Sequence, residues 1–297
     1  MNKTGIPPLE EQMEQIPGNR HGGASQLFFV PSPELRGFIS HYTVQLRCDD
    51  KQAEDRPLTI IPDASGCLVF TVAGGAVEQC FWGPNTFTQD VERDFGKITL
   101  RLLVEFLPGG AFGLFGALPL SELQNGLFTV DAIDPSLGSL FLPVVEQHHA
   151  SYPGLLRAVD ALLARRLGAV KKNGLIGRAL AAASAANGTL RLHDLSDMTS
   201  YSARHINRLC RERIGVSYKS LARVLRVNEA CRRINHGAES LTSLSYELGY
   251  CDQAHFATDF KMLCGVTPSA YRRNLSHFYN EETKLCVTLP DRYVQGG

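Results

Sequence analysis

The stretch SYELGYCDQAHFATDFKMLCGVTP, from Ser245 to Pro268, carries the signals for two helices separated by a tight break. Gly249 is suited to the positive φ that ends a helix. Asp252, three residues later, is a good N-cap for a second helix. Within that second helix Phe256 and Phe260 recur at the spacing of one helical turn and predict a buried face. The stretch therefore predicts a short helix, a tight turn and a longer helix.

The same plan occurs a second time upstream. The segment HINRLCRERIGVS, which starts at His205, aligns with HFATDFKMLCGVT, which starts at His255. In this alignment the histidine, the glycine and the valine coincide, and Arg211 is paired with Lys261. A helix, a tight break and a second helix form the helix-turn-helix motif. A plain helical module is the alternative, and side chains able to read bases at matching positions argue against it.

The outward faces of the two longer helices carry the side chains that we predict to contact DNA. In the first copy a serine caps the helix, and Arg and Asn side chains point outward. Arg can bridge guanine O6 and N7, and Asn can bridge adenine N6 and N7. In the second copy the outward residues are small or hydrogen-bonding and fit a major groove. The predicted DNA-binding residues are Ser202, Arg204, Asn207, Arg208, Arg211, Gln253, Ala254, His255, Ala257, Thr258 and Lys261.

A long helix, SYKSLARVLRVNEACRRIN, is predicted between the two copies, capped by Ser217 and closed near Gly237. Its apolar residues, among them Leu221 and Ile234, are expected to face a core. A stiff spacer of this kind can hold two recognition helices one turn of DNA apart, about 34 Å. Its basic residues are expected to face solvent or phosphate, and they are Lys219, Arg223, Arg226, Arg232 and Arg233.

Cys251, His255 and Cys264 fall within one short stretch, so a metal site is a rival interpretation. The helical rise between His255 and Cys264 is about 13 Å, too far for one ion. The upstream copy keeps a histidine, His205, and has no cysteine at either matching place. The 8 cysteines of the chain occur singly, a pattern typical of reduced thiols. We therefore predict no metal and no cofactor.

Residues 174–273 resemble the DNA-binding domain of the AraC/XylS family of bacterial transcription regulators. The text LSYELGYCDQAHFATDFKMLCGVTPSAYR carries this resemblance. It implies that Arg204, Asn207 and Arg208 read bases in one major-groove segment and that the second copy faces the next. Many members of the family carry a basic residue where Thr258 stands, so the second copy is expected to discriminate less. The family also implies a cytoplasmic protein with promoter DNA and RNA polymerase as partners.

The charge distribution is uneven along the chain. The whole sequence has 30 Lys and Arg against 30 Asp and Glu. Residues 174–273 alone hold fourteen Lys and Arg against eight Asp and Glu, a balance of 14 − 8 = +6. This favours nucleic acid as a partner, although an ordinary solvated surface explains it equally well. The run from Gly109 to Leu120 is too short to span a bilayer, so we expect no membrane segment.

From Leu27 to about Val130 the sequence consists of short apolar runs such as LFFV and GCLVFTV, cut by turn residues. These runs predict strands of an antiparallel sheet or barrel. The family resemblance implies a cupin-like barrel that senses a small-molecule effector. Side chains that combine an apolar body with a polar group are candidate ligand contacts. For each of them, barrel packing or a surface ion pair is the favoured role, and Asp63, which follows Pro62, is favoured as a turn residue. These candidates are Tyr42, Asp63, Trp82, Arg101 and Phe106.

An enzyme of the cupin type, or a protein-binding module, fused to a DNA-binding domain is the alternative function. Cupin enzymes that depend on a metal need several His ligands with a Glu. Here His41 stands alone between Leu27 and Val130. We therefore expect that the protein is not an enzyme.

The predicted fold class is α+β with several domains. It comprises an N-terminal antiparallel β-barrel, cupin-like, and a C-terminal all-α domain with two helix-turn-helix motifs. An apolar stripe from Leu155 to Leu167 either pairs two copies in a homodimer or packs on the protein's own barrel. The expected divisions are a disordered arm over 1–24, a sensor domain over 25–136, a helical connector over 137–173, the DNA-binding domain over 174–275 and a tail over 276–297.

Overall fold

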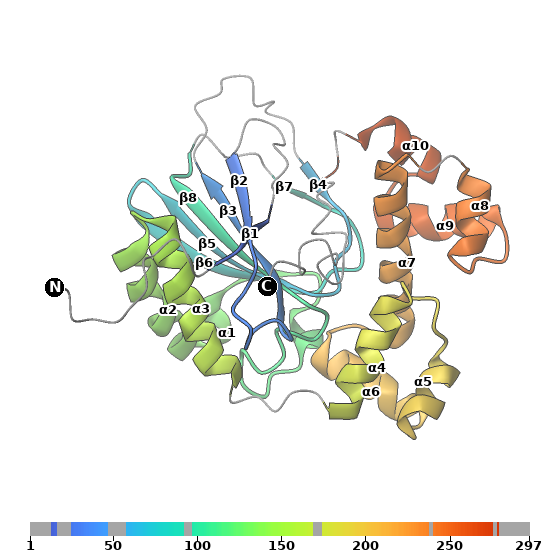
Figure 1. Cartoon of the computed structure of the whole chain (residues 1–297), viewed down its shortest axis with the longest axis horizontal. Helices are drawn as coiled ribbons and strands as arrows, with labels where there is room; N and C mark the ends of the chain where they lie inside the picture. Colours follow the sequence, from blue (N-terminus) through green and yellow to red (C-terminus); the bar gives the residue numbers. More distant parts are fainter. Residues whose placement is uncertain are drawn as a thin grey trace.

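The computed structural model describes residues 13–16, 25–46, 58–91, 97–168, 174–237, 240–275 and 278. They fold into an N-terminal part built on a β-sheet and a C-terminal part made of helices, side by side in Figure 1. This division confirms the predicted combination of a β-rich and an all-helical region. Most of the expected arm and tail lies outside the described residues.

Within the described residues the strands form a seven-stranded antiparallel sheet in the order β1-β2-β3-β8-β5-β6-β9. The two edges of this sheet, β1 and β9, are not joined to each other there, so the described strands show a sheet without barrel closure. A separate two-stranded ribbon pairs β4 (Leu58–Ile60) with β7 (Gln89–Val91). The strands of the sheet are β1 (Gln15–Ile16), β2 (Ser25–Phe29), β3 (Ile39–Leu46), β5 (Cys67–Ala73), β6 (Ala76–Trp82), β8 (Leu100–Phe106) and β9 (Leu127–Thr129).

The helices α1 (Val130–Ile133), α2 (Pro135–His148) and α3 (Tyr152–Gly168) follow the sheet, and α2 and α3 cover one of its faces (Figure 1). The ring of Phe141 on α2 lies 5.2 Å from the ring of Phe70 on β5. The hydroxyl of Tyr42 on β3 donates to Oδ1 of Asp160 on α3 at 2.8 Å. The apolar stripe of α3 is buried in this core. Packing on the protein's own sheet therefore accounts for the stripe, which gives no separate argument for pairing two copies.

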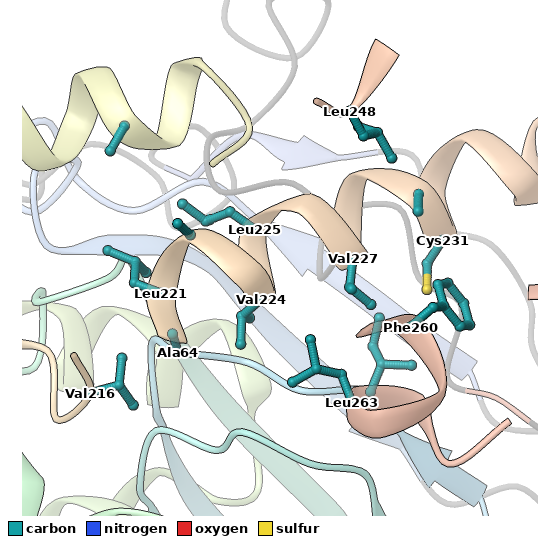
Figure 2. Packing of buried hydrophobic residues seen from close by; sticks show 14 of the residues in the cluster. Ala64, Val216, Leu221, Val224, Leu225, Val227, Cys231, Leu248, Phe260 and Leu263 are labelled. Atoms are coloured by element: carbon teal, nitrogen blue, oxygen red, sulfur yellow. The ribbon is translucent and has the colours of Figure 1, made fainter. Parts of the chain in front are cut away.

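The C-terminal part is organised around one long helix, α7 (Tyr218–Asn235), whose apolar side chains lie at the centre of a second core. Figure 2 shows Leu221, Val224 and Val227 along this helix, with Phe260 and Leu263 close to them. The other helices are α4 (Gly174–Ala185), α5 (Leu192–Thr199), α6 (Ala203–Arg213), α8 (Leu241–Glu247), α9 (Gln253–Cys264) and α10 (Pro268–Arg273).

The predicted ends of these helices are confirmed. The Ser202 side chain accepts from the backbone N–H of His205 at 3.3 Å and begins α6. The Asp252 side chain accepts from the N–H of His255 at 2.7 Å and begins α9. Ser217 caps α7 in the same way, and Gly249 has a φ of 74° just after α8. These caps satisfy backbone N–H groups that have no partner inside the helix.

None of the helices in the described ranges combines the length and the apolar character needed to cross a membrane.

Candidate nucleic-acid interface

The first helix-turn-helix unit consists of α5 and α6, and α6 is the predicted recognition helix. Ile206 and Leu209 of α6 are buried against the core, as predicted. Arg204, Arg208 and Arg211 are exposed on the opposite side. The guanidinium of Arg208 makes an ion pair of 2.9 Å with Glu212 one turn further along. This pair is exposed and worth little, so it does not prevent Arg208 from reaching another partner.

Asn207 differs from these arginines, because the structure gives its side chain two backbone partners. Its Nδ2 donates to the carbonyl of Ala203 at 3.2 Å. Its Oδ1 accepts at 3.2 Å from the backbone N–H of Tyr218, which is the first residue of α7. Asn207 therefore fastens the recognition helix to the spacer helix. Reading an adenine with the same amide would require breaking these bonds.

The second unit consists of α8 and α9, with α9 as the predicted recognition helix. Phe256 and Phe260 are buried, as predicted. The Oε1 of Gln253 accepts from the hydroxyl of Thr242 on α8 at 2.9 Å. The outward side of α9 carries exposed residues and a half-buried alanine, in the order Gln253, Ala254, His255, Ala257, Thr258 and Lys261. The predicted residues of the second unit thus lie together on the outward side of α9.

The repeated histidines contact tyrosines that precede their helices, His205 in a tilted and His255 in an edge-to-face arrangement. The ring centroids of Tyr201 and His205 are 4.6 Å apart, and those of Tyr250 and His255 are 5.2 Å apart. Both histidines therefore have a packing contact in the structure. Among the residues that the structure describes, no three Cys, His, Asp or Glu side chains lie close enough together to hold a metal ion.

Asp259 is a residue whose role the sequence did not reveal. Its carboxylate is buried and accepts from Nε of Arg223 on α7 at 2.6 Å. It also accepts from the hydroxyl of Tyr250 at 3.0 Å. Burial, followed by the nearby Asp259 carboxylate, raises the pKa of Tyr250, which therefore stays a hydrogen-bond donor. A polar residue at a position of α9 that faces the core was the available signal.

The arginines of α7 have partners inside the domain, which corrects the expectation that they face solvent or phosphate. Arg223 binds Asp259, and the guanidinium of Arg226 lies 4.9 Å from the centre of the Tyr250 ring. Arg232 pairs with Glu229 at 2.7 Å. Arg233 reaches Glu247 of α8. Arg223, Arg226 and Arg233 thus connect α7 to the second unit. The partner of Arg232 lies on α7 itself, and Lys219 is exposed.

The five candidate ligand contacts of the N-terminal part do not converge on one site. Tyr42 and Phe106 are buried on the face of the sheet that α2 and α3 cover. The strand register places Trp82 and Arg101 on the opposite face. Asp63 lies in the loop after β4, where its Oδ1 accepts from the backbone N–H of Ser65 at 2.9 Å.

The face that carries Arg101 holds further polar residues that the sequence did not single out. Gln45 is the cross-strand neighbour of Arg101, and Gln26 is the neighbour of Gln45. The side-chain oxygens of Gln26, Thr43 and Gln45 are buried and have no hydrogen-bond partner among the residues that the structure describes. Burying such an oxygen without a partner costs about 1–3 kcal/mol. This polar face is the best candidate for contact with a ligand in the N-terminal part.

Comparison with known proteins agrees with the geometry of the C-terminal part. A family model described as "Helix-turn-helix domain" matches residues 195–274. The HTH-type transcriptional regulator GlxA of Rhizobium meliloti is 32% identical over 79 residues, which are 27% of this chain and 24% of that protein. The invasion protein InvF of Salmonella typhi is 33% identical over 94 residues, 32% of this chain and 42% of InvF. The chain thus spans less than half the length of these curated relatives.

Among solved structures, unsaturated fatty acid bound ToxT of Vibrio cholerae is similar to this chain at 12% identity. The match covers 88% of this chain and 93% of ToxT, with a TM-score of 0.37. The description of the family model agrees with the repeat, the caps and the paired helices that the structure shows in residues 195–274. The match of the family model and the geometry of this region agree, and residues 195–274 of this chain are a helix-turn-helix domain.

Proposed function

We propose that the protein is a sequence-specific DNA-binding transcription regulator. The observation that carries this proposal is the presence of two recognition helices on one spacer helix, each buried on one side and open on the other. Helix α7 has 18 residues, a length of about 27 Å, which is of the order of one turn of DNA. The two units can therefore address successive segments of the major groove.

The two units contribute unequally in this proposal. Arg204 and Arg208 of α6 present guanidinium groups that can bridge guanine O6 and N7. The corresponding side of α9 offers the amide of Gln253, whose Oε1 already accepts from Thr242, and the hydroxyl of Thr258, which can make a single neutral hydrogen bond. Lys261 and Arg211 stand at aligned positions and are suited to phosphate. The caps at Ser202 and Asp252 fix the residue at which α6 and α9 begin, and so define the end of each helix that would enter the major groove.

We assign the N-terminal part the role of effector sensor, with a cupin-like barrel as its complete fold. The buried oxygens of Gln26, Thr43 and Gln45 favour a polar effector, because a ligand with hydrogen-bond donors would supply the missing partners. Effector binding would shift the population of the arrangement that binds promoter DNA and changes the contact with RNA polymerase. A cytoplasmic location and a homodimer belong to the same proposal.

A cupin-like enzyme or a protein-binding module in the N-terminal part is the alternative. The curated relatives are described as regulators or as an invasion protein, which supports a function other than catalysis. The five candidate contacts also lie on different faces and in a loop, an arrangement that provides no common site for a reacting molecule.

The proposal is tested by selecting bound duplexes from a random DNA pool with the full-length protein. We expect enrichment of two half-sites separated by about ten base pairs from centre to centre. Enrichment of a single half-site would contradict the part of the proposal in which both recognition helices contact bases. If no sequence is enriched, the protein does not recognise DNA by sequence, and the N-terminal part becomes the functional centre.

A further inference from the structure

We propose that three loops of the N-terminal part position both recognition helices and so set the spacing of the DNA that the protein accepts. The inference rests on the proposed function and adds a role for residues outside the helix-turn-helix domain. The positioning loops are residues 61–65, which follow β4, residues 83–88, which precede β7, and residues 120–125, which include the 3-10 helix η1 (Leu120–Leu123).

The first unit meets these loops at the end of its recognition helix. Gly215, just after α6, is buried and has a φ of 94°. A Cβ atom at this glycine would lie 2.9 Å from the carbonyl oxygen of Leu120 and 2.9 Å from Cγ of Pro84. Nearby, the guanidinium of Arg213 lies 5.1 Å from the centre of the Phe112 ring. The loops therefore approach the backbone of the first unit too closely for any side chain at Gly215.

The second unit meets the same loops at the equivalent place. The backbone N–H of Thr88 donates to the carbonyl of Leu263 in the last turn of α9 at 3.2 Å. Carbonyls in the last turn of a helix lack a partner within the helix, and here the N-terminal part supplies one. Gly265, which ends α9 with a φ of 73°, faces Thr88 with more room, since a Cβ would lie 3.6 Å from its Oγ1.

The spacer helix is part of the same contact. Ile61 and Ala64 of the first loop belong by packing to the core of the C-terminal part. They are 1% and 2% exposed, so the apolar contact between the two parts is closed to water. Figure 2 shows Ala64 beside Val216 and Val224. The loops thus touch the end of α6, the middle of the core and the end of α9.

Hydrogen bonds make the three loops one unit. The backbone N–H of Asn85 donates to the carbonyl of Asp63 at 2.7 Å, and the N–H of Asp63 donates to Oδ1 of Asn85. The N–H of Asn125 donates to the carbonyl of Pro84 at 2.9 Å, and its Oδ1 accepts from the N–H of Thr86 at 2.9 Å. A motion of one loop is therefore passed to the others, and both recognition helices receive it together.

The relative position of α6 and α9 has two supports in this arrangement. One is α7, on which both helices pack, and the other is the set of positioning loops. DNA half-sites that move by one base pair also rotate by about 34° around the helix axis. A protein held by both supports should reject such a shift. A protein that has lost the loop contact should tolerate the shifted half-sites and should still bind DNA.

The test compares Gly215→Ala with Gly265→Ala in the full-length protein. Both glycines have a positive φ after a recognition helix, so both substitutions cause similar backbone strain. Only Gly215→Ala also pushes against Leu120 and Pro84. Affinity is measured for a duplex selected by the wild type and for duplexes with its half-sites moved by one base pair. Circular dichroism checks that each variant is folded.

For the wild type and Gly265→Ala we expect a shift of one base pair to lower affinity about tenfold, the scale of one mismatched base pair. For Gly215→Ala we expect a loss of about threefold or less, because the rotational restraint is weaker. A general loss of stability lowers binding to every duplex equally and does not flatten this profile. Equal profiles for both glycine variants would overturn the positioning role.

Thr88 provides a second pair that remains informative if Gly215→Ala does not fold. Thr88→Pro removes the N–H that binds Leu263, whereas Thr88→Ala keeps it. We expect Thr88→Pro to flatten the spacing profile and Thr88→Ala to keep it sharp, and the same profile for both would contradict the inference. Failure of the proposed function appears separately, as a wild-type protein that selects no duplex, and the positioning role is then excluded with it.

Discussion

The two helix-turn-helix units have the same backbone plan but are fastened to α7 by different chemistry. In the first unit an apolar residue, Leu209, faces the core, and the amide of Asn207 holds the first N–H of α7. In the second unit the position aligned with Leu209 is Asp259, which is buried and bound to Arg223 and Tyr250. The comparison teaches that a recognition helix can be oriented either by packing with a neutral hydrogen bond or by a buried ion pair. The second solution depends far more on each partner being present.

Asp259→Leu places in the second unit the residue that the first unit carries, and it should have the largest effect. Arg223 loses its carboxylate and Tyr250 loses its acceptor, and breaking a buried pair costs about 3 kcal/mol. Urea unfolding of the full-length protein measures this loss. The double variant Asp259→Leu with Arg223→Met should recover the part of this loss that is due to the unpaired Arg223, because an apolar pair often replaces a buried ion pair without loss. The Tyr250 hydroxyl still lacks its acceptor in the double variant, and this should leave a deficit of about 1–3 kcal/mol. An unchanged unfolding free energy in Asp259→Leu would show that the ion pair does not hold α9.

Arg208→Ala and Thr258→Ala test whether the two units read DNA unequally, since these residues occupy aligned positions. We expect Arg208→Ala to cost about 1–3 kcal/mol of binding free energy and to relax specificity at one base pair. Thr258→Ala should cost less than about 1 kcal/mol, because it removes at most one neutral hydrogen bond. Binding to selected and scrambled duplexes measures both effects. Glu212→Gln, which only releases Arg208 from its ion pair, is the control and should not weaken binding. Equal losses on both kinds of duplex would remove Arg208 from the reading residues.

Asn207→Ala separates fastening from reading in the first unit. The N–H of Tyr218 loses its acceptor, and by analogy with a lost helix cap the protein should lose about 1 kcal/mol of stability. Asn207→Asp keeps an oxygen acceptor for the N–H of Tyr218 and should retain most of this stability. Thermal unfolding and selection from a random pool together decide the point. A change in the selected sequence without a change in stability would assign Asn207 to base reading instead.

Lys261→Ala and Arg211→Ala should have the smallest and most similar effects. Both are exposed at aligned positions, and we predict that both contact phosphate. Each substitution should weaken binding to all duplexes alike and lower the slope of log affinity against log salt by about one unit. The slope is measured by titration between low and moderate salt. If only one variant changes the slope, only one of the two units contacts the DNA phosphates through this position.

The capped ends of the helices could be predicted because their signals lie within one helical turn. Ser202 and Asp252 bind backbone groups three residues away, and Gly249 ends its helix by its own conformation. The buried faces followed in the same way from the recurrence of apolar residues such as Phe256 and Phe260. These features depend on neighbours along the chain, so a single sequence contains them.

The partners of α7 and the ligand candidates could not be predicted because they depend on elements that are distant in sequence. Arg223 and Asp259 are 36 residues apart. The sequence around Arg223 gave no indication that its partner is a buried carboxylate. From the sequence alone, Tyr42 and Trp82 were equally good candidates for ligand contact, because both combine an apolar body with a polar group. Only the strand register shows that one of them faces the helices and the other does not.

The sequence by itself determined the repeated helix-turn-helix plan, its caps, its recognition faces and the β-rich character of the N-terminal part. The tertiary structure alone decided that the stripe of α3 packs on its own sheet, and that loops near Ala64, Pro84 and Thr88 meet the ends of both recognition helices. The physical reason is that local hydrogen bonds and apolar periodicity are encoded within a few residues. Contacts between distant segments arise only when whole surfaces pack together.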